Sequence, residues 1–271
     1  MVAALLEGYS LRSKARMTSV AINTVMKLLV DLGRACLDYQ RETLVNLPCK
    51  RLQVDEIWSF CYAKQKNIPP RLQGMEGIGD VWTWTAIDAD TMLVPCWMIG
   101  GRDAGYAHEF ISDLASRLAG RVQLTSDGHK AYLEAVENAF GADVDFAQLV
   151  KLYGAERADE ARYSPTRCIG VKSHVVTGEP DGRHTSTSYI ERQNLTMRMG
   201  MRRFTRLTNA FSKKFANHAV AVALHFMNYN FARIHQMLRI TPAMAAGAAD
   251  HVCEIEEIVG LLDRKPAISA A

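Results

Sequence analysis

The chain has 271 residues, of which 48% are hydrophobic and 23% are charged, and its formal net charge is +3. These values exclude a disordered chain, which combines low hydrophobicity with a high net charge. No run of about 18 uncharged apolar residues occurs, which excludes a membrane-spanning helix and with it a membrane partner. The six cysteines include no close pair, which excludes a zinc ribbon. Because the N-terminus has no signal-peptide pattern, we expect reduced thiols in a cytoplasmic protein.

Basic residues concentrate in two segments of this nearly neutral chain. Residues 1–51 contain eight Lys or Arg against four acids, and residues 192–214 contain seven Lys or Arg and no acid. Two separate basic segments favour two surfaces for a polyanion such as a nucleic acid. The alternative is that both are solvated faces of helices.

The first 47 residues have the pattern of a helix-turn-helix domain. Residues 5–33 predict two short helices with a turn between them, the second running from about Val20 to Leu32 and ending at Gly33. The second helix of a helix-turn-helix enters the major groove, where its exposed polar side chains reach base edges or phosphates. The exposed polar residues expected here are Asn23, Thr24 and Lys27. The alternative is a small helical module for oligomerisation.

After a linker around residues 46–48, the sequence predicts three strands, a helix, a strand, a helix and a strand. Residues 51–62 alternate between apolar and polar, which is typical of a strand with one buried face. The elements that follow are expected at 81–88, 92–99, 107–119, 122–126, 130–140 and 146–153. Residues 155–188 are polar and predict an irregular excursion, and residues 210–232 predict a strongly apolar helix. This order indicates an α/β fold.

Three acids and an amide occupy positions where they can converge. Asp55 lies in the first predicted strand, Asp127 follows the strand 122–126, and Glu191 begins a helix, with Asn194 one turn later on the same face. Clustered carboxylates repel one another unless cations neutralise them, and oxygen ligands suit Mg²⁺ or Mn²⁺. Two such ions can activate a nucleophilic oxygen and stabilise the leaving oxygen at a phosphodiester. The alternative is that the strand acid simply pairs with an arginine.

Three blocks of the sequence resemble the catalytic blocks of the insertion-sequence-one family transposases. The blocks are VDEIWSF, SDGHKAY, and the stretch from SYIERQNLTMRMGMRRFTRLTNAFSKKFANH to HFMNYNF. These transposases are DDE recombinases with an RNase H-like fold. The acids of the family match Asp55, Asp127 and Glu191, and its Asn three residues after the Glu matches Asn194. The resemblance covers roughly residues 50–235, but the cysteine-paired zinc element that many relatives carry ahead of the helix-turn-helix is not present.

The resemblance implies an α/β protein with an RNase H-like mixed sheet flanked by helices and a small N-terminal all-α helix-turn-helix domain. The expected division is a DNA-binding domain at 1–47, a catalytic domain at 48–235 and a C-terminal tail at 236–271. The implied activity is transposition of DNA, in which metal-dependent phosphodiester hydrolysis at the element ends is followed by strand transfer. An RNase H-like nuclease and an inactive DNA-binding repressor derived from a transposase are the alternatives.

The resemblance also implies roles for residues and partners. Asp55, Asp127 and Glu191 would hold two Mg²⁺ or Mn²⁺ ions, and Asn194 would donate to a phosphate oxygen or orient the glutamate. The basic residues expected to clamp the DNA backbone are Arg192, Arg198, Arg202, Arg203, Arg206, Lys213 and Lys214. The implied partners are the terminal inverted repeats and the target, both double-stranded DNA, and a second copy of the chain. The implied location is the bacterial cytoplasm, at the nucleoid when DNA is bound.

Other conspicuous side chains are expected to be structural. Glu56 follows Asp55 in the strand and is expected on the opposite face. His129 is expected either at the DNA or in a hydrogen-bonded surface position. His218 and His225 lack a third ligand nearby and are expected in the core or an interface. The residues expected to serve packing are Trp82, Trp84, Trp97, Met197, Met199 and Met201.

Overall fold

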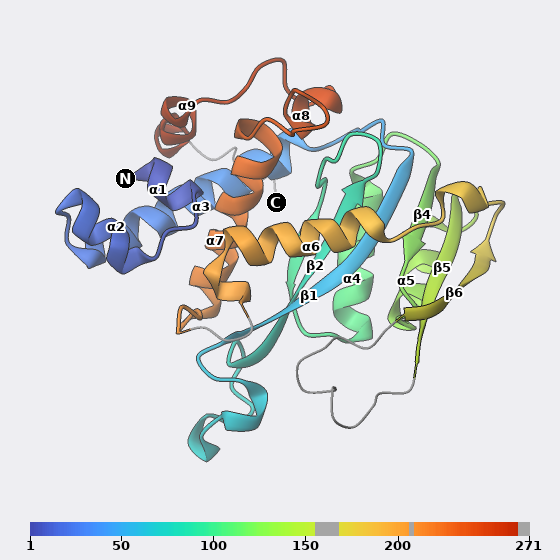
Figure 1. Cartoon of the computed structure of the whole chain (residues 1–271), viewed down its shortest axis with the longest axis horizontal. Coiled ribbons are helices and arrows are strands. Elements are labelled where there is room, and N and C mark those ends of the chain that lie inside the picture. Colours follow the sequence, from blue (N-terminus) through green and yellow to red (C-terminus); the bar gives the residue numbers. More distant parts are fainter. Residues whose placement is uncertain (155–167, 206–208, 265–271) are drawn as a thin grey trace, which may run out of the picture.

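The centre of the molecule is a mixed β-sheet with helices on both faces (Figure 1). The structure, a computed structural model, describes residues 1–154, 168–205 and 209–264. Within them the strands are β1 (Arg51–Cys61), β2 (Gly79–Asp88), β3 (Trp97–Gly100), β4 (Val122–Ser126), β5 (Val144–Tyr153) and β6 (Cys168–Thr177). Their order is β3-β2-β1-β4-β5-β6, with β1, β4 and β5 parallel and the other pairings antiparallel. The predicted α/β class is confirmed, and the arrangement is compatible with an RNase H-like fold.

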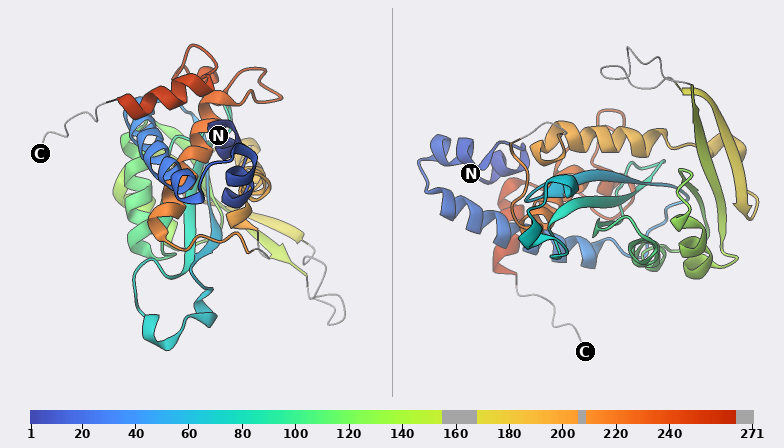
Figure 2. Two further views of the ribbon diagram at one scale, coloured as in Figure 1. Left: turned by 90° about the vertical axis from the view of Figure 1, so that its left-hand side faces the viewer. Right: turned by 90° about the horizontal axis from the view of Figure 1, so that it is seen from below.

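Helices cover the sheet on both sides. The helices are α1 (Val2–Leu6), α2 (Leu11–Thr18), α3 (Ile22–Thr43), α4 (Ala104–Ser116), α5 (Ala131–Phe140), α6 (Ser188–Gly200), α7 (Phe215–Met227), α8 (Pro242–Ala245) and α9 (Ile255–Gly260). Short 3₁₀ turns lie at Gln65–Asn67, Pro70–Leu72, Gly182–His184, Arg202–Phe204 and Leu261–Asp263, and a π turn lies at Asn228–Ala232. Figure 2 shows α6 on one face of the sheet and α4 and α5 on the other. Consequently β1 is buried on both faces, with Leu52, Val54 and Ile57 inaccessible to solvent. No helix in the described part of the chain is long and apolar enough to cross a bilayer.

The predicted strand at 92–99 is wrong for most of its length, since β3 begins only at Trp97. Ahead of β3, only the carbonyl groups of Leu93 and Cys96 accept hydrogen bonds from β2 among the described residues, and the backbone of Val94 bonds to a side chain instead. Val94 N donates to Asn230 Oδ1 at 3.0 Å, and Asn230 Nδ2 donates to Val94 O at 2.9 Å. The chain before β3 is therefore anchored on the segment that follows α7. Sequence alternation does not reveal this kind of anchoring.

The predicted irregular excursion at 155–188 contains a long strand. Residues 155–167 lie outside the described part, but β6 pairs antiparallel with β5 and extends the sheet. Its apolar side chains are left at the surface, with Ile169 67% and Val175 54% exposed. A strand without a buried face lacks the hydrophobic pattern by which strands are recognised. That is why the sequence did not indicate it.

The second N-terminal helix is longer than predicted. Gly33 does not end it, because α3 continues to Thr43. A Cβ atom at Gly33 would lie 2.4 Å from the carbonyl oxygen of Val220 on α7, so the glycine permits close contact between the two helices. The buried side chains of α3, among them Leu29 and Leu32, belong to the same hydrophobic cluster as those of the sheet. The helices of residues 1–47 therefore pack against the same core as the sheet, and their status as a domain stays a prediction.

The apolar helix predicted at 210–232 begins later, at Phe215. Ahead of it, Tyr62 N donates to Ser212 O at 2.7 Å, so this stretch is bonded to the end of β1. The expected tail from residue 236 includes α8 and α9, which add Ala243 and Ile258 to the core. It is therefore part of the packed structure as far as residue 264.

Candidate functional site

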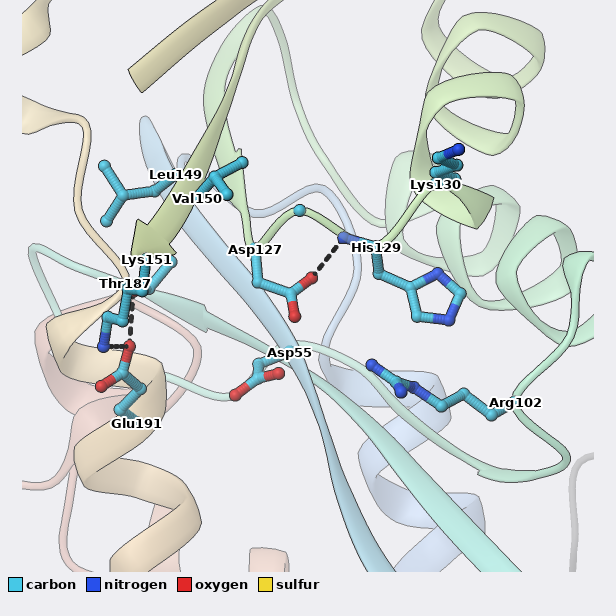
Figure 3. Close-up of a pocket in the computed structure, with 11 residues that line it drawn as sticks. Asp55, Arg102, Asp127, His129, Lys130, Leu149, Val150, Lys151, Thr187 and Glu191 are labelled. Atoms are coloured by element: carbon cyan, nitrogen blue, oxygen red, sulfur yellow. Dashed lines mark hydrogen bonds and ion pairs between the residues drawn. The ribbon is translucent and has the colours of Figure 1, made fainter. Parts of the chain in front are cut away.

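Three predicted acids line one cavity of about 610 Å³ (Figure 3). Asp55 lies on β1, Asp127 directly follows β4, and Glu191 lies in the first turn of α6. The parallel register pairs Val54 with Ser126, so Asp55, in the middle of β1, lies beside Asp127 at the carboxyl end of β4. This is the edge of an α/β sheet at which ligands bind. The remaining lining residues are Arg102, Gly128, His129, Lys130, Leu149, Val150, Lys151 and Thr187.

Hydrogen bonds fix the two aspartates and tie α6 to β1. Asp127 Oδ1 accepts from the backbone N–H of His129 at 2.9 Å. Asp55 Oδ1 accepts from the backbone N–H of Glu56, and its Oδ2 accepts from Asn194 Nδ2, both at 2.8 Å. Asn194 was expected to serve a phosphate or Glu191. Its described donor contact is with Asp55.

Glu191 is held by its own set of contacts. Its Oε1 accepts from Thr187 Oγ1 at 2.6 Å and from Lys151 Nζ on β5. The start of α6 is fixed to the central strand, because Gln53 Oε1 accepts from the backbone N–H groups of Tyr189 and Ile190 at 2.9 and 3.1 Å. The sequence did not single out Gln53. Its place two residues before Asp55, on the same side of a strand, was the signal available.

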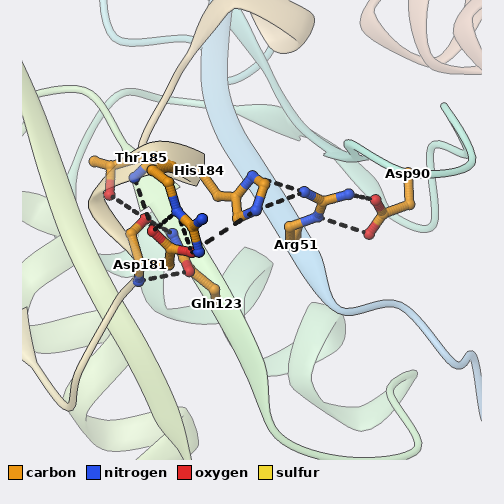
Figure 4. A network of polar contacts seen from close by, with 7 residues as sticks. Arg51, Asp90, Gln123, Asp181, His184 and Thr185 are labelled. Carbon is orange, nitrogen blue, oxygen red and sulfur yellow. Dashed lines mark hydrogen bonds and ion pairs between the residues drawn. The ribbon is translucent and has the colours of Figure 1, made fainter.

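The segment between β6 and α6 is anchored by a polar network (Figure 4). Gln123 Nε2 donates to Asp181 O at 3.1 Å, and Gln123 Oε1 accepts from Asp181 N at 3.0 Å. Arg51 Nη1 lies 2.6 Å from His184 Nδ1, and the same guanidinium pairs with Asp90. Because this segment leads into α6, the network restrains the position of Glu191 relative to the sheet.

The prediction for Glu56 is corrected by the geometry. One carboxylate oxygen each of Asp55, Glu56 and Asp127 lie within 4.8 Å of one another. Neighbours in a strand point to opposite faces, but the Asp55 carboxylate folds back along the strand to accept from Glu56 N. The Glu56 side chain is 1% exposed, and neither of its oxygens has a hydrogen-bond partner among the described residues. The basic groups facing it are Arg102, with Nε at 3.5 Å, and the His129 ring, with Nε2 at 3.7 Å.

Burial and mutual repulsion perturb these acids. Burial, followed by the charge of Asp127, raises the pKa of Asp55 to about 6. Burial, followed by the charges of Asp127 and Asp55, raises the pKa of Glu56 to about 8. The pKa of His129 is lowered by burial and by Arg102, which disfavours its cationic form. The cluster of Asp55, Glu56 and Asp127 therefore has too little positive charge around it to neutralise three ionised carboxylates.

The donor set fits a hard divalent cation. All the ligand atoms on offer are carboxylate oxygens, and two buried ones, on Glu56, have no hydrogen-bond donor. Mg²⁺ and Mn²⁺ prefer such ligands. Asp55, Glu56 and Asp127 would hold such a cation, which would supply Lewis-acid chemistry there, and Glu191 lines the same cavity.

The residues predicted to contact DNA differ in their exposure to solvent. Those at the surface are Asn23, Thr24 and Lys27 on α3, together with Arg192, Arg202, Lys213 and Lys214. Lys27 also pairs with Asp31 at 2.6 Å. Arg198 is half-buried, and Arg206 lies outside the described residues.

Arg203, which was expected to contact the DNA backbone, forms hydrogen bonds within the chain. Its Nη1 donates to Ser212 Oγ at 2.6 Å and to Asn217 O at 3.2 Å. Burial lowers the pKa of this guanidinium. Arg203 joins the segment after α6 to the start of α7, and its role in a DNA clamp stays a prediction.

The expected core residues are mostly confirmed. His218 is inaccessible and lies between Ser59 and Ser212, and burial lowers its pKa to about 3. Burial lowers the pKa of His225 to about 4. Trp84, Met197 and Met201 are buried, whereas Met199 is 74% exposed and Trp82 and Trp97 are half-buried.

The arrangement can bind a divalent cation beside a cavity that is open to solvent. No protein-family model matches the chain, and no curated protein matches it either. The functional assignment therefore depends on the site and on the sequence blocks that form it.

Proposed function

We propose that the protein is a DDE transposase, which cleaves the ends of a mobile DNA element and joins them to a target. The observation that carries the proposal is the convergence of Asp55, Asp127 and Glu191 at one cavity, from β1, the end of β4 and α6, with Asn194 hydrogen-bonded to Asp55. These four residues lie in the sequence blocks that resemble the insertion-sequence-one family. A sheet compatible with the RNase H-like fold supports the same assignment.

Asp55, Asp127 and Glu191 would hold Mg²⁺ or Mn²⁺, with Glu56 as a further carboxylate within reach. When bound, the ions would activate an oxygen nucleophile and stabilise the leaving oxygen of the phosphodiester. The residues of the chain keep the ligands in place: Asn194 orients Asp55, and Thr187 orients Glu191. Preorganised ligands avoid the free-energy cost of rearrangement during the reaction.

Recognition of the element ends would fall to the N-terminal helices. A three-residue turn, 19–21, separates α2 from α3, and Asn23, Thr24 and Lys27 are exposed on the first turns of α3. This supports a helix-turn-helix whose second helix is α3. The partners would be the terminal inverted repeats, the target DNA and a second copy of the chain, since two ends require two sites. The protein would then act at the nucleoid of a bacterial cytoplasm.

The test is a cleavage and strand-transfer assay on the DNA that flanks the gene, with Mg²⁺ or Mn²⁺. The Asp127→Asn variant keeps the shape of the side chain and removes its charge. The matched control is Asp143→Asn, at an exposed aspartate between α5 and β5. We expect metal-dependent nicking at the 3′ ends and joined products from the wild type and the control, and neither from Asp127→Asn.

Other results would contradict the proposal in different ways. Nicking without joining would indicate an RNase H-like nuclease. Specific DNA binding with no chemistry in any variant would indicate a repressor.

A further inference from the structure

Arg102 enters the cavity from the side opposite Glu191. It lies between β3 and α4, outside both basic segments of the sequence. Figure 3 shows its guanidinium pointing toward Asp55 and Asp127, while Lys151 and Glu191 lie across the cavity. The residue therefore brings a permanent positive charge to the side of the cavity opposite Glu191.

Two neighbours hold the guanidinium in place. Its central carbon lies 4.7 Å from the ring centroid of Trp82 on β2. Its Nε lies 3.5 Å from Oε1 of the buried Glu56. Stacking on an aromatic face together with an ion pair restricts both the plane and the direction of an arginine.

Most N–H donors of the Arg102 guanidinium have no acceptor among the described residues. The Arg102 side chain is 39% exposed, and its ion pair with Glu56 is its one polar contact with the described residues. At 3.5 Å that contact is too long for a strong hydrogen bond. The terminal Nη1 and Nη2 groups thus remain able to donate into the cavity.

The chemistry of the surroundings indicates what would accept these hydrogen bonds. Carboxylates repel an anionic substrate, so a site that binds one needs fixed cations beside its metal ligands. A guanidinium matches the paired oxygens of a phosphate and donates to them through two parallel N–H groups. The preorganisation by Trp82 and Glu56 lowers the entropy lost when it does so.

We propose that Arg102 binds the non-bridging oxygens of a backbone phosphate of the nucleic acid at this cavity. The identity of the ligand as DNA rests on the proposed function, whereas the phosphate site itself does not. The contact carries no sequence information, since phosphate contacts position a duplex without reading it.

The first experiment measures binding of a labelled DNA duplex across a series of salt concentrations. The variants are Arg102→Ala and Arg102→Lys, with Arg239→Ala, an exposed arginine between α7 and α8, as the control. Loss of one phosphate contact should weaken binding by Arg102→Ala roughly 5- to 10-fold at 0.1 M salt and reduce the log–log salt slope by about 0.9. Arg102→Lys should keep the slope, because it keeps the charge, and lose part of the affinity with the paired geometry. The control should match the wild type.

The second experiment uses inorganic pyrophosphate in place of DNA, with Mn²⁺ present, and measures binding by calorimetry. Loss of pyrophosphate binding in Arg102→Ala, but not in the control, supports the phosphate site at Arg102. If the wild type binds pyrophosphate in this way but fails to bind DNA, the transposase proposal alone is rejected. Unchanged affinity and slope for DNA in Arg102→Ala, or unchanged binding of pyrophosphate, overturns the inference. So does a wild type that binds neither probe.

Discussion

Asp55 and Glu56, adjacent on the central strand, hold their protons more tightly in the fold than in the unfolded chain. Burial is the leading cause, and it raises the pKa values to about 6 and about 8. Between the ordinary pKa of a carboxyl group, about 4, and these values, the folded state binds more protons than the unfolded state. The stability of the metal-free protein therefore decreases as the pH rises through this range. The cost of ionising Glu56 in the fold is fully present above about pH 8.

We predict that Glu56→Gln raises the melting temperature of the metal-free protein at pH 8.5 and leaves it unchanged near pH 4. The amide cannot ionise, so it does not incur the cost of burying a charge, and each kcal/mol recovered corresponds to roughly 2–4 °C. Thermal denaturation followed by circular dichroism in the presence of a chelator measures the effect. Glu134→Gln, at an exposed acid on α5, is the control and should change neither value. A lower melting temperature for Glu56→Gln at pH 8.5 would mean that Glu56 is ionised and stabilised by Arg102.

The residues of the site differ in how far the sequence predicts them. Asp55, Asp127 and Glu191 were predicted because each acid lies in or directly after a recognisable strand or helix, where a carboxylate needs an explanation. The supporting residues Gln53 and Arg102 were not, because their significance depends on which segments meet in the fold. Gln53 matters because α6 begins beside it, and Arg102 because Trp82 and Glu56 lie on either side of it. Such neighbours, distant in sequence, leave no local pattern.

At the level of elements, burial decides which predictions succeed. The strands β1, β4 and β5 carry apolar side chains that are buried in the core, and the sequence predicted all three strands. The missed strand β6 presents its side chains to solvent and is held by backbone hydrogen bonds to β5, which any sequence can form. Gly33 was misinterpreted for a related reason. A glycine that ends a helix and one that permits close packing look alike until the partner helix is known.

We predict that Gly33→Ala destabilises the protein by about 1–3 kcal/mol, although alanine is intrinsically the better helix former by about 1 kcal/mol. The added Cβ would lie 2.4 Å from a backbone oxygen of α7, so the two helices must move apart. The control is Gly260→Ala on α9, where nothing lies within 4 Å of the added atom and the propensity gain should appear. Urea denaturation measures both. If Gly33→Ala is as stable as Gly260→Ala, the close contact between α3 and α7 is not present in solution.

At the level of the whole molecule, the N-terminal helices and the sheet share one hydrophobic core. Leu29 on α3 and Val220 on α7 belong to the same buried cluster as Val54 and Leu124 of the sheet. If α3 also reads DNA, as proposed, the DNA-binding surface and the candidate active site are connected by packed side chains and not by a linker. Their relative position would then be fixed before DNA binds.

This shared core predicts that the protein unfolds in one step. The four tryptophans, Trp58, Trp82, Trp84 and Trp97, all lie on β1, β2 or β3, so their fluorescence reports on the sheet alone. Leu29→Ala on α3 removes a buried side chain, which costs about 2–5 kcal/mol of stability. It should lower the midpoint temperature of unfolding by the same amount whether unfolding is followed by fluorescence or by far-ultraviolet circular dichroism. Lys27→Ala, on an exposed face of α3, should shift neither. A fluorescence transition that stays in place while the helical signal melts earlier would show that residues 1–47 fold as a separate domain. The fixed geometry between α3 and the candidate active site would then be rejected.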